Sequence, residues 1–157
     1  MRLCINQKIF SWADKFSVKD GYGEERYFVE AELFSFGRKL HVYDTSGREV
    51  ALISQKVMTF MPKYEVYVNG RQLCRITKEF TLFKPQYTIE GLDWTVDGDF
   101  WDHDYTITGQ GRTIATIQKE WFTWGDCYVA DIENSINEIM VLAVVLAIDC
   151  VLASQNS

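Results

Sequence analysis

The pattern of hydrophobic and polar residues is dominated by β-strand signals up to about residue 131, and residues 64–68 alternate with a period of two. Short runs rich in β-branched and aromatic residues are separated by turn-forming residues, which is the pattern of short strands joined by turns. The clearest run is Tyr64-Glu65-Val66-Tyr67-Val68, which ends at Asn69-Gly70, a strong signal for a two-residue hairpin. The pattern predicts twelve strands, near residues 3–9, 16–19, 26–33, 39–43, 50–56, 63–68, 73–78, 86–90, 94–97, 104–108, 113–119 and 127–131.

A sequence repeat supports this division into strands. Three copies begin with Gly-Arg, at Gly47-Arg48, Gly70-Arg71 and Gly111-Arg112, and each continues with an apolar strand pattern. The copies then share an aromatic position followed by a tyrosine: Phe60 and Tyr64, Phe83 and Tyr87, Trp124 and Tyr128. Because the spacing between copies changes from 23 to 41 residues, repeated hairpins in one continuous sheet fit better than a regular array.

The C-terminal segment departs from the strand pattern. Ser135 and Glu138 have the spacing of a capping box, and ten apolar residues follow without a break from Ile139 to Ile148. A helix over residues 136–153 would have no polar face, so it must be buried on all sides. The run is shorter than the roughly 20 apolar residues of a membrane span, and Asp149 interrupts it. Burial inside the protein is therefore favoured over insertion into a bilayer.

The need to bury this helix decides the fold class. A sheet of twelve strands is too large to stay open without curling or splitting. At about 1.5 Å per residue the helix would be about 27 Å long, close to the length of an eight-residue strand. Closing the sheet around the helix buries the helix and removes the sheet edges. We therefore predict an all-β fold with one helix, in which a closed antiparallel barrel of about twelve strands (residues 1–133) surrounds a central helix (135–153) in a single domain.

Charge and cysteine usage limit the function and the location. The formal net charge of −6 argues against nucleic-acid binding and weakens any broad attraction to anionic membranes, leaving room only for a small local basic site. The four cysteines are well separated and form no CxxC motif, so we expect reduced thiols packed as small apolar residues. The N-terminus has no signal-peptide apolar stretch, so we expect a cytoplasmic protein, with peripheral membrane attachment as the alternative.

A family resemblance is carried by residues 16–20, 27–30, 34–44 and 94–100, together with the Gly-Arg repeats. Together these segments resemble the LURP-one-related proteins, whose fold is like that of the tubby C-terminal domain and the phospholipid scramblases. The resemblance implies a twelve-stranded barrel around a C-terminal helix, in agreement with the pattern above. Tubby domains bind phosphoinositides and scramblases are membrane proteins, but the paired basic motif of the former cannot be placed here and the cysteine cluster of the latter is absent.

Two side-chain clusters are candidate sites. Asp97, Asp99, Asp102 and Asp104 could offer hard oxygen ligands to Ca²⁺, although they lack EF-hand spacing; the competing interpretation is a solvated acidic loop. Arg48, Arg71 and Arg112 occupy equivalent turn positions, so they would form an anion site if they gathered at one barrel rim; the competing interpretation is scattered arginines paired with carboxylates.

The sequence shows no convergent set of catalytic groups. His41 and His103 are too few and too far apart for a zinc site, and neither accompanies a nucleophile motif. We therefore expect no cofactor and no enzymatic activity, but a binding or scaffold domain that acts through the barrel rim and loops. Its partner would be a protein or, as the alternative, a phospholipid headgroup such as a phosphoinositide.

Overall fold

The structure is a computed structural model that describes residues 1–6, 15–34, 37–79, 81, 86–122 and 125–154. Each of the twelve predicted strands overlaps an observed strand, although residues 7–9 of the first lie outside the described residues. The elements are β1 (Arg2–Asn6), β2 (Lys15–Asp20), β3 (Glu25–Phe34), β4 (Gly37–Asp44), β5 (Glu49–Gln55), β6 (Lys63–Val68), β7 (Arg71–Glu79), β8 (Gln86–Glu90), β9 (Trp94–Asp99), β10 (Asp104–Gly109), β11 (Arg112–Phe122), β12 (Gly125–Ile132) and α1 (Glu138–Ala153).

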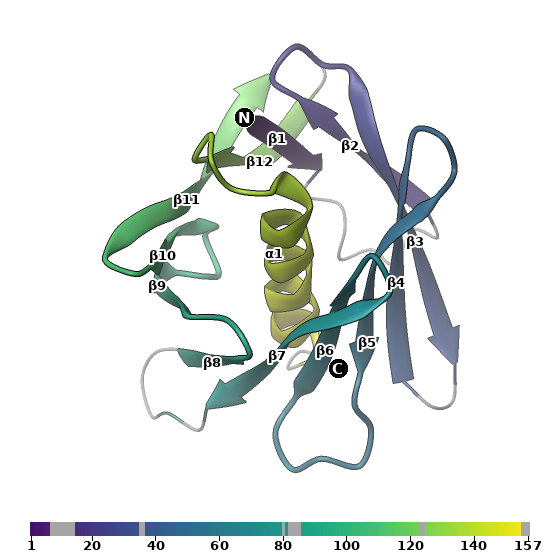
Figure 1. The fold of residues 1–157 in the computed structure, drawn as a ribbon, viewed down its shortest axis with the longest axis vertical. Helices are drawn as coiled ribbons and strands as arrows, with labels where there is room; N and C mark the ends of the chain where they lie inside the picture. Colours follow the sequence, from purple (N-terminus) through teal and green to yellow (C-terminus); the bar gives the residue numbers. More distant parts are fainter. Residues whose placement is uncertain (7–14, 35–36, 80, 82–85, 123–124, 155–157) are drawn as a thin grey trace.

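The strands form a single antiparallel sheet that curls into a nearly closed barrel. Its order is β8-β7-β6-β5-β4-β3-β2-β1-β12-β11-β10-β9, so the first strand of the chain pairs with the last. The two edge strands, β8 and β9, follow each other in the chain through residues 91–93, and this short connection spans the seam. Figure 1 shows the strands arranged around α1. The predicted fold class is confirmed.

The Gly-Arg repeats mark hairpin turns. Asn69 and Gly70 have φ angles of 50° and 79°, and Gln110 and Gly111 have φ angles of 52° and 74°. Two successive residues with positive φ match the twist of the flanking strands in a two-residue hairpin, which is why glycine is favoured there. Arg71 and Arg112 therefore begin β7 and β11, whereas Arg48 is the last residue of the turn before β5.

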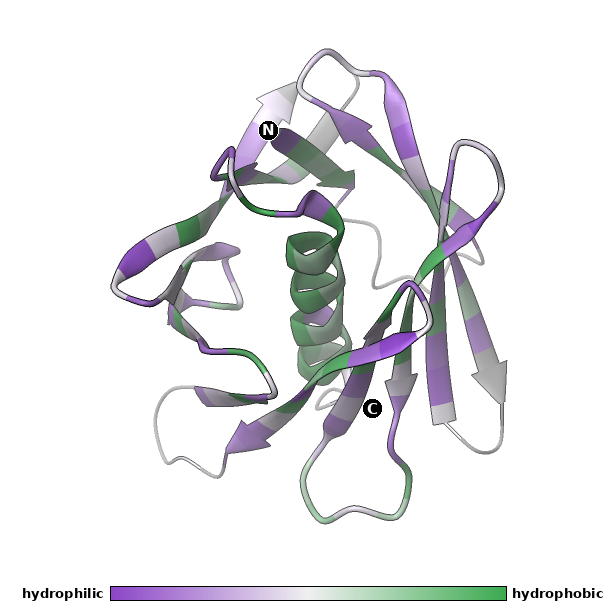
Figure 2. Cartoon of the chain, in the orientation of Figure 1, coloured by the Kyte–Doolittle hydropathy of each residue, from purple (hydrophilic) through white to green (hydrophobic). Residues whose placement is uncertain are grey.

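The helix α1 is the centre of the hydrophobic core. Every residue from Val141 to Leu152 is buried, and Figure 2 shows that the helix is hydrophobic along most of its length. Inward-facing strand residues such as Val66, Ile107 and Ile117 pack in the same core and have no exposed surface. Since a side chain of this size contributes about 1.5–3 kcal/mol when fully buried, the helix is a main source of stability.

The start of the helix differs from the prediction. The N-cap is Asn137, whose side chain accepts a hydrogen bond from the backbone N–H of Ile139, so the expected capping box between Ser135 and Glu138 does not form. Glu138 instead accepts hydrogen bonds from Arg26 (2.5 Å) and from the hydroxyl of Tyr27 (2.8 Å). The Glu138 carboxylate therefore forms an ion pair with Arg26 of β3 instead of capping the backbone at the start of the helix.

Candidate functional site

The antiparallel topology sorts the strand connections into two groups at opposite ends of the barrel. One end, here called the turn end, carries residues 21–24, 45–48, 69–70, 91–93 and 110–111 together with the connection 133–137 to the helix. The other end, here called the loop end, carries residues 56–62 and 100–103 among the described connections, and also the C-terminus of α1. A binding surface built from connections must therefore belong to one end or the other.

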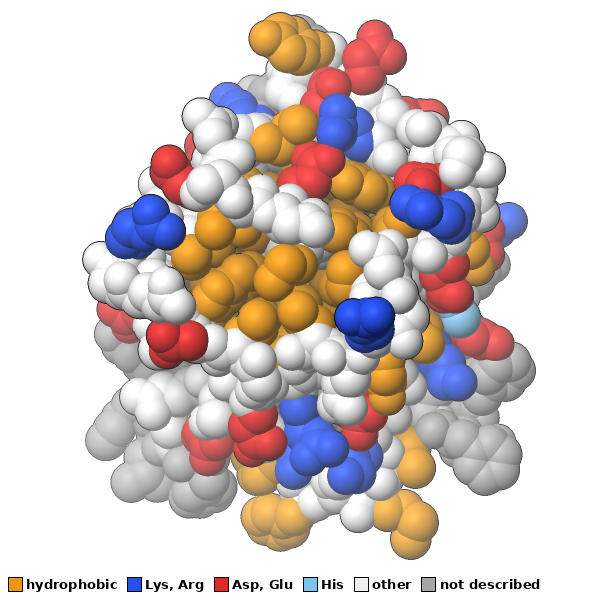
Figure 3. Space-filling model, viewed as in Figure 1, with side chains coloured by type: hydrophobic (Ala, Val, Ile, Leu, Met, Phe, Trp, Pro, Cys, Tyr) orange, Lys and Arg blue, Asp and Glu red, His pale blue; other side chains and the backbone are white. Residues whose placement is uncertain are grey.

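The three repeat arginines share the turn end but are not neighbours in the sheet. Arg48 and Arg71 belong to the adjacent hairpins β4–β5 and β6–β7, with β6 between the strands that follow them, whereas Arg112 belongs to β10–β11 beyond the seam between β8 and β9. All three arginines are exposed. Arg48 lies 3.5 Å from the carboxylate of Asp44 in its own turn. Figure 3 shows basic and acidic side chains interspersed around the viewed face. An anion site formed by all three arginines gains no support from this spacing and stays a prediction.

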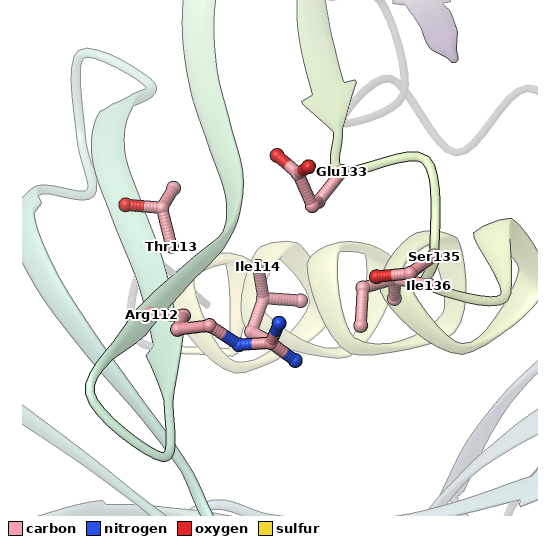
Figure 4. A pocket seen from close by; sticks show the side chains of 6 residues that line it. All are labelled: Arg112, Thr113, Ile114, Glu133, Ser135 and Ile136. Atoms are coloured by element: carbon pink, nitrogen blue, oxygen red, sulfur yellow. The ribbon is translucent and has the colours of Figure 1, made fainter.

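Arg112 lines a small pocket at the turn end. The pocket has a volume of about 260 Å³ and lies between the start of β11 and the connection from β12 to α1. Figure 4 shows the Arg112 side chain extending across it toward Ser135 and Ile136. Glu133 also lines the pocket, and Figure 4 shows its carboxylate directed away from Arg112, so the lining combines one basic, one acidic and several uncharged side chains. This environment is less selective for an anion than a purely basic pocket.

The acidic cluster is an exposed hairpin. Asp97 and Asp99 lie on β9, Asp104 pairs with Asp99 across the ladder, and Asp102 lies in the turn. Asp99 accepts a hydrogen bond from the backbone N–H of Asp102 (3.1 Å), and Lys119 lies 3.4 Å from the Asp102 carboxylate. Within the described part of the chain, no three His, Cys, Asp or Glu residues are grouped so that they could hold a metal. Calcium binding by the four aspartates stays a prediction.

The two histidines have carboxylate partners in different surroundings. His41 lies on the sheet between Glu32 (2.6 Å) and Glu49 (2.5 Å). Partial burial opposes protonation of its ring, but its hydrogen bonds to these two carboxylates outweigh burial and raise its pKa. His103 lies inside the barrel, 2% exposed, and stacks on Tyr128 with ring centroids 4.1 Å apart.

A buried polar cluster in the interior is centred on Asp149 of α1. The Asp149 carboxyl group is 1% exposed, and it accepts a hydrogen bond from the hydroxyl of Tyr128 on one oxygen. Its other oxygen lies 3.1 Å from Nε2 of His103. Burial raises the pKa of Tyr128 well above its usual value, and the nearby Asp149 raises it further. Because the cluster is sealed from solvent, its geometry is that of a structural network within the core.

The four cysteines are free and buried, as expected from their spacing. Burial raises the pKa of Cys74 to about 12 and that of Cys127 to about 12. It also raises the pKa values of Cys4 and Cys150. Thiols that remain protonated at neutral pH are poor nucleophiles, so these positions behave as small apolar residues.

The loop end displays large apolar side chains that sequence analysis did not single out as a surface. Met58 is fully exposed (101%) and Phe60 is 96% exposed, both in the connection between β5 and β6. Trp101 and Trp121 are also exposed near this end of the barrel. The repeat had already aligned Phe60 with Phe83 and Trp124 as aromatic connections, which was the available signal, but Phe83 and Trp124 lie outside the described residues.

This combination of a twelve-stranded barrel, a buried C-terminal helix and Gly-Arg hairpins agrees with the comparison with known families. A family model described as LURP-one-related matches residues 1–149. The chain belongs to the LURP-one-related family. The resemblance that the sequence carried is thereby confirmed for nearly the whole chain.

A bacterial relative extends this assignment. The chain is 34% identical over 152 residues to the uncharacterized protein YxjI of Bacillus subtilis (strain 168), which covers 97% of this chain and 94% of that protein. Because this relative is described as uncharacterized, the match supports the family assignment but identifies neither a partner nor a substrate for the chain.

A plant protein shares the fold. The X-ray structure of a protein from Arabidopsis thaliana matches with a TM-score of 0.66 and 15% sequence identity, over 94% of this chain and 88% of that one. At this level of identity the match is evidence for the fold alone. Among the residues that the structure describes, no helix has the length and apolar character needed to cross a membrane.

Proposed function

We propose that the chain is a non-catalytic binding module that contacts its partner through the loop end of the barrel. The observation that carries this proposal is the distribution of exposed apolar side chains. Five of the eight large exposed hydrophobic residues within the described ranges lie at or beside the loop end: Val57, Met58, Phe60, Trp101 and Trp121. Apolar side chains grouped at one end of a molecule commonly mark an interaction surface.

The interior of the barrel supports a binding function over catalysis. The side chains of α1 fill the space that a ligand would need, and the acid–base pair of His103 and Asp149 is sealed within the core. An enzyme would require titratable groups that converge on an accessible pocket. The pocket beside β11 has Arg112 and Glu133 as its charged lining residues, and a second pocket, beside Thr45 and Gly47, has the carboxylates of Glu30 and Asp44.

Site-specific photo-cross-linking in cells tests which end binds. A photoreactive phenylalanine analogue replaces Phe60 at the loop end or, as the matched control, Tyr22, which is 92% exposed at the turn end. We expect adducts from position 60 and few from position 22, and their mass would identify a protein or a phospholipid. Equal adducts at both positions, or adducts at position 22 alone, would contradict the assignment of the loop end.

A further inference from the structure

The connection between β5 and β6 projects beyond the barrel. Residues 56–63, here called the projecting loop, read Lys-Val-Met-Thr-Phe-Met-Pro-Lys, with Met58 and Phe60 almost completely exposed. Figure 1 draws this loop at the bottom of the molecule, where Figure 3 shows apolar side chains extending from the surface. Exposure of two large side chains in one short connection is costly in water, so a partner that covers them is expected.

The projecting loop is built to hold these side chains outward. The backbone N–H of Lys56 donates to the carbonyl of Lys63 (2.9 Å) and closes the base of the loop. The hydroxyl of Thr59 lies 2.9 Å from the carbonyl oxygen of Met61 and 3.3 Å from that of Lys56. Because the backbone is already tied, little ordering entropy remains to be lost when the loop binds.

A close contact also supports the base of the projecting loop. A Cβ atom at Gly37 would approach Cγ1 of Val57 to 2.8 Å, so only glycine leaves room for Val57 there. Met58 has a φ of 61°, a conformation that non-glycine residues rarely adopt and that often marks a functional segment. Val57 thus packs toward β4, while Met58 and Phe60 remain exposed.

The charges within the projecting loop are positive although the whole chain is acidic. Lys56 and Lys63 flank the apolar residues, and residues 56–63 contain no carboxylate. The backbone N–H of Lys78 donates to the carbonyl of Pro62 (3.1 Å), which brings a third lysine beside the loop. Of the carboxylates on the neighbouring strands, Glu65 pairs with Arg75 and Glu32 lies beside His41, whereas Glu79 accepts a hydrogen bond from the neutral hydroxyl of Thr88. Because the exposed acidic hairpin around Asp102 belongs to the same end, the positive charge is confined to the loop itself.

We propose that the projecting loop docks on the surface of an anionic lipid bilayer. In this arrangement Met58 and Phe60 enter the boundary between headgroups and acyl chains, and Lys56 and Lys63 contact lipid phosphates. The inference rests on the proposed use of the loop end and names the partner of that end. A bilayer fits better than a protein groove because an apolar tip with a lysine on each side matches an apolar layer beneath anionic headgroups.

Vesicle flotation of the full chain tests the proposal. The vesicles contain phosphatidylcholine alone, or phosphatidylcholine with roughly one third phosphatidylserine, whose negative surface attracts lysine. We expect binding to the anionic vesicles, reduced by at least about tenfold for each apolar side chain removed in Met58→Ser/Phe60→Ser. The matched control Tyr22→Ser removes an equally exposed aromatic ring from the turn end and should bind like the unmodified protein.

Lysine variants test the electrostatic part. Lys56→Gln/Lys63→Gln should weaken binding by about fivefold per lysine at low salt, and by less as salt screens the headgroups. The control Arg71→Gln removes an exposed cation from the turn end and should have little effect. Because the native thiols are buried, a fluorophore can be attached to a Met58→Cys variant, and its emission should shift to the blue with anionic vesicles. The same label on Tyr22→Cys should show no shift.

The outcomes separate this inference from the proposed function. Absence of flotation with anionic vesicles, or equal losses for the loop variants and Tyr22→Ser, would overturn bilayer docking. If the photoreactive analogue at position 60 captures a protein while vesicles fail to bind, the loop end remains the binding surface and only its bilayer partner is rejected. Adducts confined to position 22 would instead reject the proposed function.

Discussion

The hydrogen bond from Tyr128 to Asp149 provides a test of what holds the helix inside the barrel. A Tyr128→Phe substitution removes only the hydroxyl and keeps the ring that stacks on His103. One oxygen of the buried Asp149 carboxyl group then loses its donor, while the other remains beside His103. A buried acceptor left without a partner costs about 1–3 kcal/mol. For a domain of this size, that corresponds to a decrease in melting temperature of several degrees.

Tyr105 supplies a matched control with the opposite expectation. Its ring is buried next to Phe100, but among the described residues its hydroxyl has no hydrogen-bond partner. Tyr105→Phe therefore removes a buried polar atom that forms no bond, and it should leave stability unchanged or increased. The same chemical change is thus predicted to have different effects at two core positions.

Urea unfolding followed by near-ultraviolet circular dichroism measures both variants. We expect a lower midpoint for Tyr128→Phe and an unchanged or higher midpoint for Tyr105→Phe, with similar slopes. In an Asp149→Leu background the cost of Tyr128→Phe should disappear, because no carboxyl group remains to be satisfied. Equal destabilisation by the two substitutions, or a cost that persists in that background, would refute this account of the cluster.

Three further predictions concern the helix, the surface histidine and the acidic hairpin. Leu146→Ala should cost about 2–5 kcal/mol in urea unfolding, and a fragment ending at Ser135 should be insoluble or lack a cooperative transition; a folded, soluble fragment would contradict the central helix. His41→Gln should destabilise the protein most below about pH 6.5, the usual pKa of histidine. The loss of stability should become smaller as the pH rises through the raised pKa of His41 in the folded state, and urea unfolding midpoints across this pH range measure it. Sub-millimolar Ca²⁺ should leave the melting temperature unchanged, and a clear increase would show that the hairpin around Asp102 binds the metal.

The barrel could be predicted because its determinants are local or purely apolar. Tyr64–Val68 alternates with period two and ends at Asn69-Gly70, and the structure places β6 and its hairpin there. The run from Ile139 to Ile148 has no polar face, so its burial followed from composition alone. In both cases a few neighbouring residues contain the information that decides the structure.

The side-chain partnerships could not be predicted because they join residues that are distant in the chain. Glu138 has capping-box spacing relative to Ser135, yet it bonds to Arg26, which is 112 residues away. Asp149 was seen as an interruption of an apolar run, while its hydrogen-bond partners are His103 in the β9–β10 connection and Tyr128 on β12. Local spacing shows that a charged residue in a buried helix needs a partner, but the barrel geometry determines which residue that is.

The sequence repeat explains why the two ends of the barrel differ. Each copy has a polar Gly-Arg turn before one strand and an aromatic connection after it. In an antiparallel sheet, successive connections alternate between the two ends, so the turns around Arg48, Arg71 and Arg112 all fall at one end and Phe60 falls at the other. Since α1 already fills the interior, this difference places the almost completely exposed side chains of Met58 and Phe60 at the loop end, where a partner can bury them. Figure 3 shows further apolar side chains at the centre of the viewed face. A change that moves the projecting loop, such as Gly37→Ala against Val57, should therefore alter binding while the turn end keeps its structure.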